Sequence, residues 1–205
     1  MKIVTIPHPS LRTPASPVTL VDKKLKNFVV ELQQTLAEKD HPKGVGFAAP
    51  QVDMKWRIFA TQLSASSDQD AENDYQLRAF INPEIVDHST HQIYGPNPDD
   101  TTLEGCLSIP GIYGPVPRWE KITLRYDEIV GDELQERIAE FRDFAARVIQ
   151  HEHDHLNGIL FIDYVAEYGL PLYQEHPRTK KLIEITQEMV SALLQKSLWR
   201  HLPLV

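Results

Sequence analysis

Residues 150–156 read Gln150-His151-Glu152-His153-Asp154-His155-Leu156 and contain the pattern H-E-x-x-H. On an α-helix, residues i and i+4 lie about one turn apart on one face, so His151 and His155 can bind one divalent ion. Glu152 directly follows the first of them and can exchange a proton with a water held by that ion. A pattern with three fixed positions also arises by chance in many chains. Alone it leaves a hydrolytic metal site and an ordinary helix equally open.

The flanking residues predict a helix over about 141–156. Phe144 and Val148 precede His151 by seven and three positions, which places them on the ligand face and puts an apolar wall beside the ion. Asn157-Gly158 then supplies a helix stop. His153 lies two residues from each ligand, so we expect it to point off that face and to be exposed.

A catalytic metal site usually has three protein ligands and one open position. Downstream of the predicted helix, Asp163 and Glu167 are candidates for the third ligand. Upstream stands Cys106, the only cysteine in the chain. A lone cysteine is most often a small buried apolar residue, but Gly105 permits a close backbone approach and the residues after Cys106 indicate the end of a strand. A Cys-His-His site and a site completed downstream both remain open from these residues alone.

Three segments match, in order and with roughly the same spacing, the signature motifs of one known family. Residues 44–51 match G-x-G-L-A-A-x-Q, with Phe47 in place of Leu, and residues 104–108 are identical to E-G-C-L-S. Residues 150–156 match Q-H-E-x-D-H-L. The chain therefore resembles the peptide deformylases over roughly residues 3–165. One such motif would be weak evidence, whereas three in register are strong evidence.

This resemblance implies a reaction, the removal of the N-formyl group from the initiator methionine of new polypeptides with release of formate. It implies Glu152 as the general base. It also implies that the side-chain amide of Gln51 and the backbone N–H of Leu107 stabilise the negative charge that develops on the formyl oxygen. The implied metal ligands are Cys106, His151 and His155.

The substrate would lie beside Gly44, Val45 and Gly46, whose backbone can pair with a peptide as an added strand. The two glycines also fit an ordinary turn. Val45, Phe144 and Val148 are candidates for an apolar pocket that holds the methionine side chain, with ordinary core as the competing interpretation. Tyr113 stands where many family members have Arg, which predicts an altered contact with the peptide beyond methionine.

The resemblance also implies one divalent metal ion per chain. Fe²⁺ would be the most active form in the cell, with Ni²⁺ or Co²⁺ as working substitutes. Affinity alone favours Zn²⁺ over Fe²⁺ at a Cys-His-His site. An iron–thiolate site would be sensitive to oxygen, because the thiolate and the ferrous ion can both be oxidised.

The composition argues against several classes of protein. A formal charge of −8 leaves no broad basic field for nucleic acid, and no apolar run is long enough to suggest a membrane span. One cysteine excludes an internal disulfide framework and suits a reducing cytosol. Pro7 interrupts the apolar start too early for a signal peptide. We therefore expect a cytoplasmic enzyme that acts on N-formylmethionyl nascent peptides, with the ribosome exit region as a further candidate partner.

The patterns of apolar residues predict an α+β fold in which antiparallel β-sheets surround the central metal-binding helix, with a C-terminal helix. We expect a catalytic domain over 1–165 and a divergent extension over 166–205 that carries the last helix and packs on the same domain. Its role could be an oligomer contact, a ribosome contact or a surface helix. The predicted elements are a helix over 22–39 capped by Asp22, strands over 57–61, 79–81 (ended by Asn82-Pro83), 122–126 and 134–139, polar loops over 62–76 and 95–100, and a helix within 178–198 with Leu182, Ile185, Met189, Leu193 and Lys196 on one side.

Two other hypotheses compete with a deformylase. An endopeptidase built on H-E-x-x-H would need a third ligand downstream and would have no role for Cys106. A non-catalytic metal-binding or ribosome-associated module would need neither Glu152 nor Gln51. Glu104 and Arg118 are candidates for an ion pair next to the site, and a surface position is the alternative for Arg118.

Overall fold

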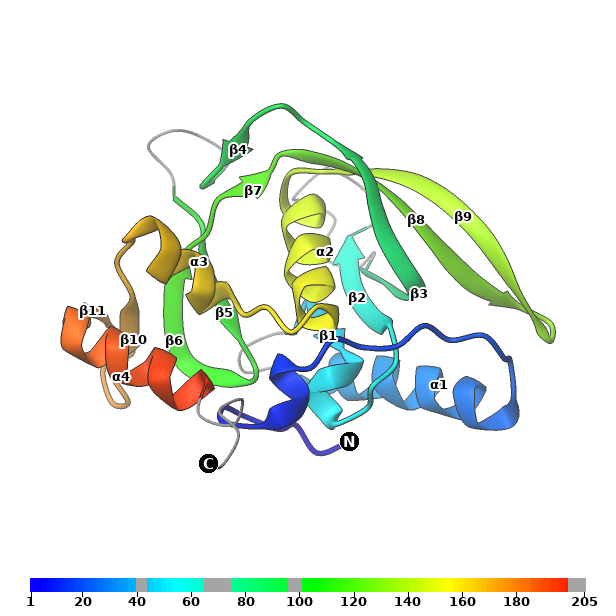
Figure 1. Cartoon of the computed structure of the whole chain (residues 1–205), viewed down its shortest axis with the longest axis horizontal. Helices are drawn as coiled ribbons and strands as arrows, with labels where there is room; N and C mark the ends of the chain where they lie inside the picture. Colours follow the sequence, from blue (N-terminus) through cyan, green and yellow to red (C-terminus); the bar gives the residue numbers. More distant parts are fainter. Residues whose placement is uncertain (40–43, 65–74, 96–100, 199–205) are drawn as a thin grey trace, which may run out of the picture.

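The computed structural model describes residues 1–39, 44–64, 75–95 and 101–198. Antiparallel sheets lie on either side of helix α2 (Asp143–Leu156), which stands in the middle of the molecule (Figure 1). This arrangement confirms the predicted α+β class with a central helix and antiparallel sheets. It places the H-E-x-x-H segment between the two largest sheets.

The larger sheet has five strands in the order β1-β2-β3-β8-β9, and the second has four in the order β11-β10-β6-β5. A two-stranded sheet joins β4 (Gln92–Ile93) to β7 (Arg118–Trp119). The strands of the larger sheet are β1 (Gly46–Ala48), β2 (Ile58–Ser64), β3 (Tyr75–His88), β8 (Lys121–Val130) and β9 (Glu133–Arg142). Those of the second are β5 (Leu103–Cys106), β6 (Ile109–Pro115), β10 (Tyr173–Glu175) and β11 (Leu182–Glu184).

The other helices are α1 (Lys23–Ala37), α3 (Phe161–Tyr168) and α4 (Gln187–Leu198), with short 3-10 helices η1 (Pro9–Arg12) and η2 (Ala49–Val52). Helix α1 confirms the prediction over 22–39. The Asp22 side chain accepts a hydrogen bond from the Leu25 backbone N–H at 2.7 Å and so satisfies one free donor of the first turn. The apolar residues Leu25, Phe28, Leu32 and Leu36 recur at helical spacing on α1 and are buried against the larger sheet.

The predicted end of a strand at Asn82-Pro83 was wrong, because β3 continues through it to His88. Asn82 has φ +49°, and the register with β8 shifts between Ile81 and Glu84, which marks a β-bulge. The Asn82 side chain bonds both backbone groups of Val18 at 2.8 Å. A bulge therefore accommodates the proline that would otherwise interrupt the ladder.

The β8–β9 hairpin confirms the predicted pairing, with Leu124 opposite Ala139 and Ile129 opposite Leu134. Because β9 runs to Arg142, helix α2 begins at Asp143 and not at 141. The predicted loop over 62–76 is too long at both ends, since β2 reaches Ser64 and β3 starts at Tyr75. Residues 65–74 of that loop and 96–100 of the next lie outside the described residues.

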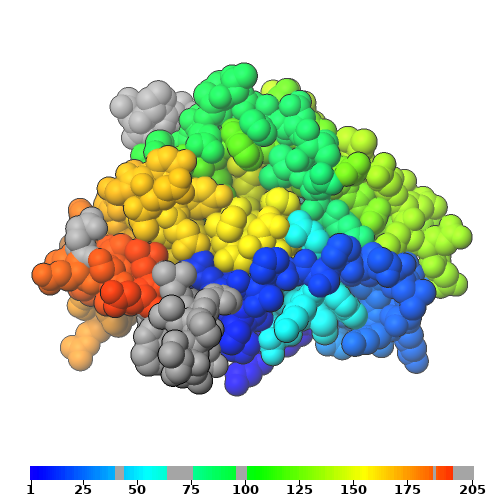
Figure 2. All heavy atoms as spheres, viewed as in Figure 1, coloured from blue at the N-terminus to red at the C-terminus, as the bar shows by residue number. Residues whose placement is uncertain are grey.

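The C-terminal segment begins with a hairpin, where a single helix was expected. Leu182 lies in β11 and is exposed, so the predicted one-sided stripe of α4 is wrong at that residue. Met189 is also exposed, whereas Ile185 and Val190 are buried together with Phe161 in one core cluster. Figure 2 shows the last part of the chain, in orange and red, gathered on one side of the molecule beside the segment that follows α2.

Candidate active site

Helix α2 and the end of β5 bring the three predicted ligands together. Their candidate ligand atoms, one each from Cys106, His151 and His155, lie within 4.8 Å of one another. Cys106 Sγ is 3.3 Å from His155 Nε2. The two histidines are one helical turn apart and the cysteine lies on the facing strand, so residues 49 positions apart form one cluster.

This donor set fits a divalent metal ion with a fourth position left open. The ring of His151 is held by a hydrogen bond between its Nδ1 and Glu104 Oε2 at 2.9 Å. Such an outer partner fixes the orientation and tautomer of a ligating imidazole. His155 Nδ1 is buried and has no hydrogen-bond partner among the described residues. Its other nitrogen faces Cys106 and can serve as the ligand atom.

Neither downstream candidate for the third ligand belongs to this cluster. Asp163 accepts a hydrogen bond from Arg12 Nη2 at 2.8 Å and another from the Leu160 backbone N–H. Glu167 is exposed on α3. The structure therefore favours Cys106 as the third ligand over the endopeptidase arrangement.

Glu104 and Arg118 form the predicted ion pair, and the alternative of a surface arginine is wrong. Arg118 is 2% exposed and donates from Nε and Nη2 to the two carboxylate oxygens of Glu104 at 2.9 and 2.8 Å. Arg118 Nη1 donates a hydrogen bond to Asp154, which links the C-terminal end of α2 to β7. Arg147 Nη1 donates to Glu104 Oε1 at 2.8 Å. Two buried carboxylates thus face two buried guanidinium groups.

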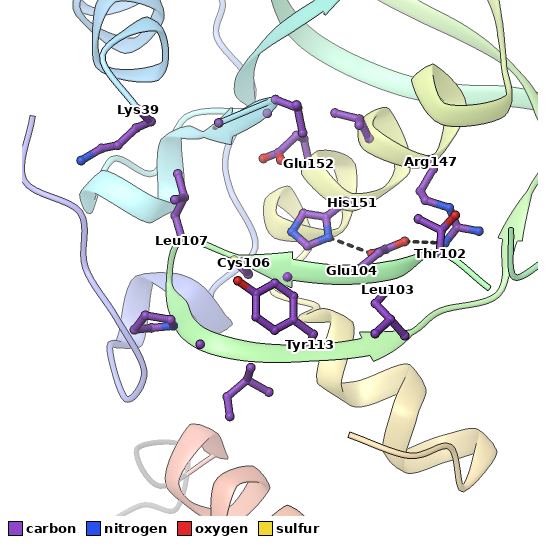
Figure 3. A pocket seen from close by; sticks show the side chains of 18 of the residues that line it. Lys39, Thr102, Leu103, Glu104, Cys106, Leu107, Tyr113, Arg147, His151 and Glu152 are labelled. Carbon is purple, nitrogen blue, oxygen red and sulfur yellow. Dashed lines mark hydrogen bonds and ion pairs between the residues drawn. The ribbon is translucent and has the colours of Figure 1, made fainter. Parts of the chain in front are cut away.

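Arg147 was not singled out in the sequence, although a signal was present. It stands between Ala146 and Val148 in an apolar stretch of α2, one turn before His151. A charge at that position needs a buried partner, and Glu104 provides it. Figure 3 shows the resulting chain of contacts from Arg147 through Glu104 to His151.

The electrostatics of His155 and of Glu104 suit metal binding. Burial, and then the charge of His151, lower the pKa of His155 well below its usual value, which keeps that imidazole neutral. Burial raises the pKa of Glu104, but the charge and hydrogen bonds of Arg118 outweigh it and leave the pKa well below its usual range. Glu104 therefore stays ionised behind His151.

Glu152 directly follows His151 on α2 and is 4% exposed. Its Oε2 atom is buried without a hydrogen-bond partner among the described residues. Burial raises the pKa of Glu152 to about 7. A Cβ atom added to Gly46 would lie 2.3 Å from Glu152 Oε1, so the carboxylate packs directly against the glycine backbone.

Gln51 faces the same cluster from η2. Its Nε2 atom lies 3.4 Å from Cys106 Sγ and 3.3 Å from Ser108 Oγ, while its Oε1 accepts the Ala48 backbone N–H at 2.8 Å. The last bond orients the amide so that its donor points toward the cluster. Leu107, the other candidate donor, follows Cys106 directly.

One cavity of about 860 Å³ is lined by Cys106 and His151 of this cluster, and by Glu152 and Gln51. The five residues proposed to bind substrate, and Leu107, all lie on its wall, with Val148 buried and Phe144 exposed. In Figure 3 the side chain of His151 projects from α2 toward β5, that of Glu152 lies on the side of β1, and Tyr113 lies beside Cys106. The lining residues that sequence reasoning did not predict include Ile3, Lys39, Glu175 and Lys180.

His153 does point off the ligand face, but the expectation that it is exposed was wrong. It is half-buried, with Nε2 3.4 Å from Arg57 Nη2. Burial and the charge of Arg57 lower its pKa to about 4. His153 therefore belongs to the packing behind α2 and not to the ligand cluster.

Comparison with known proteins agrees with this geometry. The family model described as polypeptide deformylase matches residues 1–169. The chain belongs to the peptide deformylase family. It is similar to a peptide deformylase of Rhodopirellula baltica, with 38% identity over 86% of this chain and 78% of that protein. Peptide deformylase 1 of Bacillus subtilis is also 38% identical, over 82% of this chain and 91% of its own length.

Solved deformylase structures share the fold. The crystal structure of the Thermotoga maritima deformylase superposes with a TM-score of 0.64 at 36% identity, covering 80% of this chain and 95% of that one. A Plasmodium falciparum deformylase structure gives a TM-score of 0.67 at 30% identity and covers 98% of this chain and 99% of its own. Within the part of the chain that the structure describes, no helix is both long and apolar enough to cross a membrane.

Proposed function

We propose that this protein is a metal-dependent hydrolase that removes the N-formyl group from the N-terminal methionine of newly made polypeptides. The products are formate and a free amine. The observation that carries the proposal is the cluster of Cys106, His151 and His155 at a cavity that Glu152 and Gln51 also line. Membership of the peptide deformylase family supports the same reaction.

Cys106, His151 and His155 would hold the metal. When bound, the ion lowers the pKa of a coordinated water and polarises the formyl carbonyl. Glu152 accepts a proton from the water that attacks the formyl carbon, and it returns that proton to the amine nitrogen as the C–N bond breaks. A pKa of about 7 suits a group that must do both near neutral pH.

The negative charge on the formyl oxygen needs donors that are already in place. Gln51 Nε2 is oriented toward the cluster because its Oε1 accepts a hydrogen bond from the Ala48 backbone N–H. The Leu107 backbone N–H is the second proposed donor. Preorganised donors are effective because they need not reorient as the charge develops.

The peptide would pair with residues Gly44, Val45 and Gly46. Strand β1 begins at Gly46 and, among the described strands, has a hydrogen-bonded neighbour only on the β2 side. Its other edge is therefore available to an extended peptide, as in other cases of strand addition. Val45, Val148 and Phe144 line the cavity and are proposed to hold the methionine side chain.

The metal in the cell would be Fe²⁺, with Zn²⁺, Ni²⁺ or Co²⁺ possible in purified protein. We place the enzyme in the cytoplasm, where a single thiol stays reduced and nascent chains are available. The ribosome exit region is a further candidate partner. We also propose that residues 1–165 form the catalytic domain, with 166–205 as a divergent extension on it. Metal analysis of anaerobically purified protein tests the choice of ion.

The function is tested with three substrates given to Ni²⁺-loaded protein. Formyl-Met-Ala-Ser should release formate, whereas acetyl-Met-Ala-Ser and casein should remain intact. Cys106→Ser should lose formate release. Protein that holds one metal per chain and releases no formate would contradict the proposal, and cleavage of casein would favour the endopeptidase hypothesis in its place.

A further inference from the structure

The outer part of the cavity is built by a segment that lies beyond residues 1–169, the span of the family model. Strand β10 pairs with β6 in antiparallel register, with Tyr173 opposite Tyr113. Directly paired residues share a face of the sheet, and residues two apart on a strand share it too. Glu175 therefore lies on the same face as Tyr113. Both residues line the cavity that contains His151 and Glu152.

Lys180 joins Glu175 at this position from the turn between β10 and β11. Its Nζ atom is 2.7 Å from Glu175 Oε1, and both residues line the cavity. The side chain of Lys180 is 70% exposed and that of Glu175 is 29% exposed. Glu152 is only 4% exposed. The pair thus marks the solvent end of the cavity, while Glu152 lies at its buried end.

A second lysine lines the same cavity from the end of α1. Lys39 is half-buried and packs beside Gly44, where an added Cβ would lie 3.1 Å from Lys39 Cβ. Lys39, Lys180 and Glu175 together carry two positive charges and one negative charge. These three described residues therefore contribute a net positive charge to the cavity, in a protein whose formal charge is −8.

The chemistry of the substrate determines where the peptide must leave. A formyl group occupies the first residue of a chain, so all later residues extend away from the buried cluster and out through the mouth. A cavity of about 860 Å³ lies in the upper part of the range for small-molecule sites, about 300–1,000 Å³, and leaves room beyond the first residue. Lys39, Glu175 and Lys180 are the charged lining residues outside the buried end that an emerging peptide can meet.

We infer that Glu175 and Lys180 of the β10–β11 hairpin, together with Lys39, form a specificity subsite for the peptide after formylmethionine. This subsite favours an acidic side chain at the third or fourth residue. The inference rests on the proposed deformylase function. Because Lys180 is mostly exposed, the preference is modest and weakens as salt screens the charges.

The test compares kcat/KM for formate release among peptides that differ only in charge. The peptides all end in an amide, so that only Xaa is charged; they are formyl-Met-Ala as the short reference, and formyl-Met-Ala-Xaa-Ser and formyl-Met-Ala-Ser-Xaa with Xaa as Glu or Lys. At low salt the wild type should prefer Glu over Lys at one of these positions by about two- to five-fold, the size of an exposed ion-pair effect. The preference should shrink at high salt.

Lys180→Glu should abolish or reverse this preference and leave formyl-Met-Ala unchanged. Glu175→Gln should increase the preference. Lys181→Glu is the matched control, because Lys181 is the exposed neighbour in the same hairpin and does not line the cavity. It makes the same charge change and should behave like the wild type.

Several outcomes would overturn the subsite. One is a wild type whose kcat/KM does not differ between Glu and Lys peptides. Another is an equal change of this preference in Lys180→Glu and Lys181→Glu. A third is an equal loss of kcat/KM by Lys180→Glu on formyl-Met-Ala and on the longer peptides. The last would show that the hairpin acts only on structure. Failure of the wild type to release formate even from formyl-Met-Ala would instead reject the proposed function, and the subsite with it.

Discussion

The two ends of the cavity both carry charged side chains, but they hold them in opposite ways. At the buried end, Glu104 bonds Arg118, Arg147 and His151, and each of these residues is mostly buried. At the mouth, Lys180 has one ion-pair contact with Glu175 and is mostly exposed. Buried charges with several partners fix geometry, whereas exposed charges adjust affinity by small amounts. The buried end therefore determines the chemistry, and the mouth selects among substrates.

The largest effect should come from Glu152 at the buried end. Glu152→Gln keeps the size of the side chain and removes its ability to accept a proton. We expect kcat to fall by about 10²- to 10⁴-fold, the usual contribution of a general acid–base group. Metal content should stay at the wild-type level. A variant with full metal and more than a tenth of wild-type kcat would show that another group is the base.

Arg118→Leu should cause the largest loss of stability. It leaves the carboxylates of Asp154 and, in part, Glu104 buried without their partner, which typically destabilises a protein by about 3–5 kcal/mol. Chemical denaturation measures the change. Arg125→Leu is the matched control, because that arginine pairs with Glu84 on the surface. The control should unfold at the wild-type midpoint, and equal losses in the two variants would contradict the contrast between buried and exposed charge.

Gln51→Ala removes one of the two proposed donors to the formyl oxygen. Loss of one such donor typically lowers kcat by about 10²- to 10³-fold. KM should change little, because the donor acts mainly on the charge that develops in the transition state. Steady-state kinetics on formyl-Met-Ala-Ser separates the two constants. A rise in KM with unchanged kcat would make Gln51 a ground-state contact.

Gly46→Ala should disturb the buried end through geometry alone. The added Cβ would overlap the Glu152 carboxylate, whose Oε1 lies 2.3 Å from its position. Displacing a catalytic group by about 1 Å can lower the rate by about 100-fold. The unfolding midpoint and the metal content should remain near those of the wild type. Unchanged kcat would mean that Glu152 works from another position.

The parts of the fold that follow local rules were predicted well. Helix α1 has a regular apolar stripe and a capping Asp22, and α2 has its ligand spacing and the Asn157 stop. Each helix is therefore predictable from residues that are close together in the sequence. Strand β3 was cut short in the prediction, because Asn82-Pro83 normally ends a strand. Pairing with β2 and β8, and the Asn82 bonds to Val18, sustain the strand through that point.

In the candidate site, too, the residues in local motifs were predicted and those placed by distant contacts were not. The motifs and the family resemblance brought out the ligand cluster, with Glu152 and Gln51 beside it. Glu175 and Lys180 have no motif, and their place at the cavity depends on β10 pairing with β6, about 60 residues earlier in the chain. The pairing of β10 with β11 draws Leu182 into a strand and away from the predicted helix. Contacts between distant strands leave little trace in a local pattern.

The most direct test of the central claim is a titration of metal-free protein with Ni²⁺, in which formate release from formyl-Met-Ala and bound metal are followed together. We expect activity to rise in proportion to bound metal, to level off at one ion per chain, and to be absent in Cys106→Ser. Full activity in the chelated protein, or wild-type activity in Cys106→Ser, would contradict the assignment of the Cys106, His151 and His155 cluster as the metal centre of the reaction.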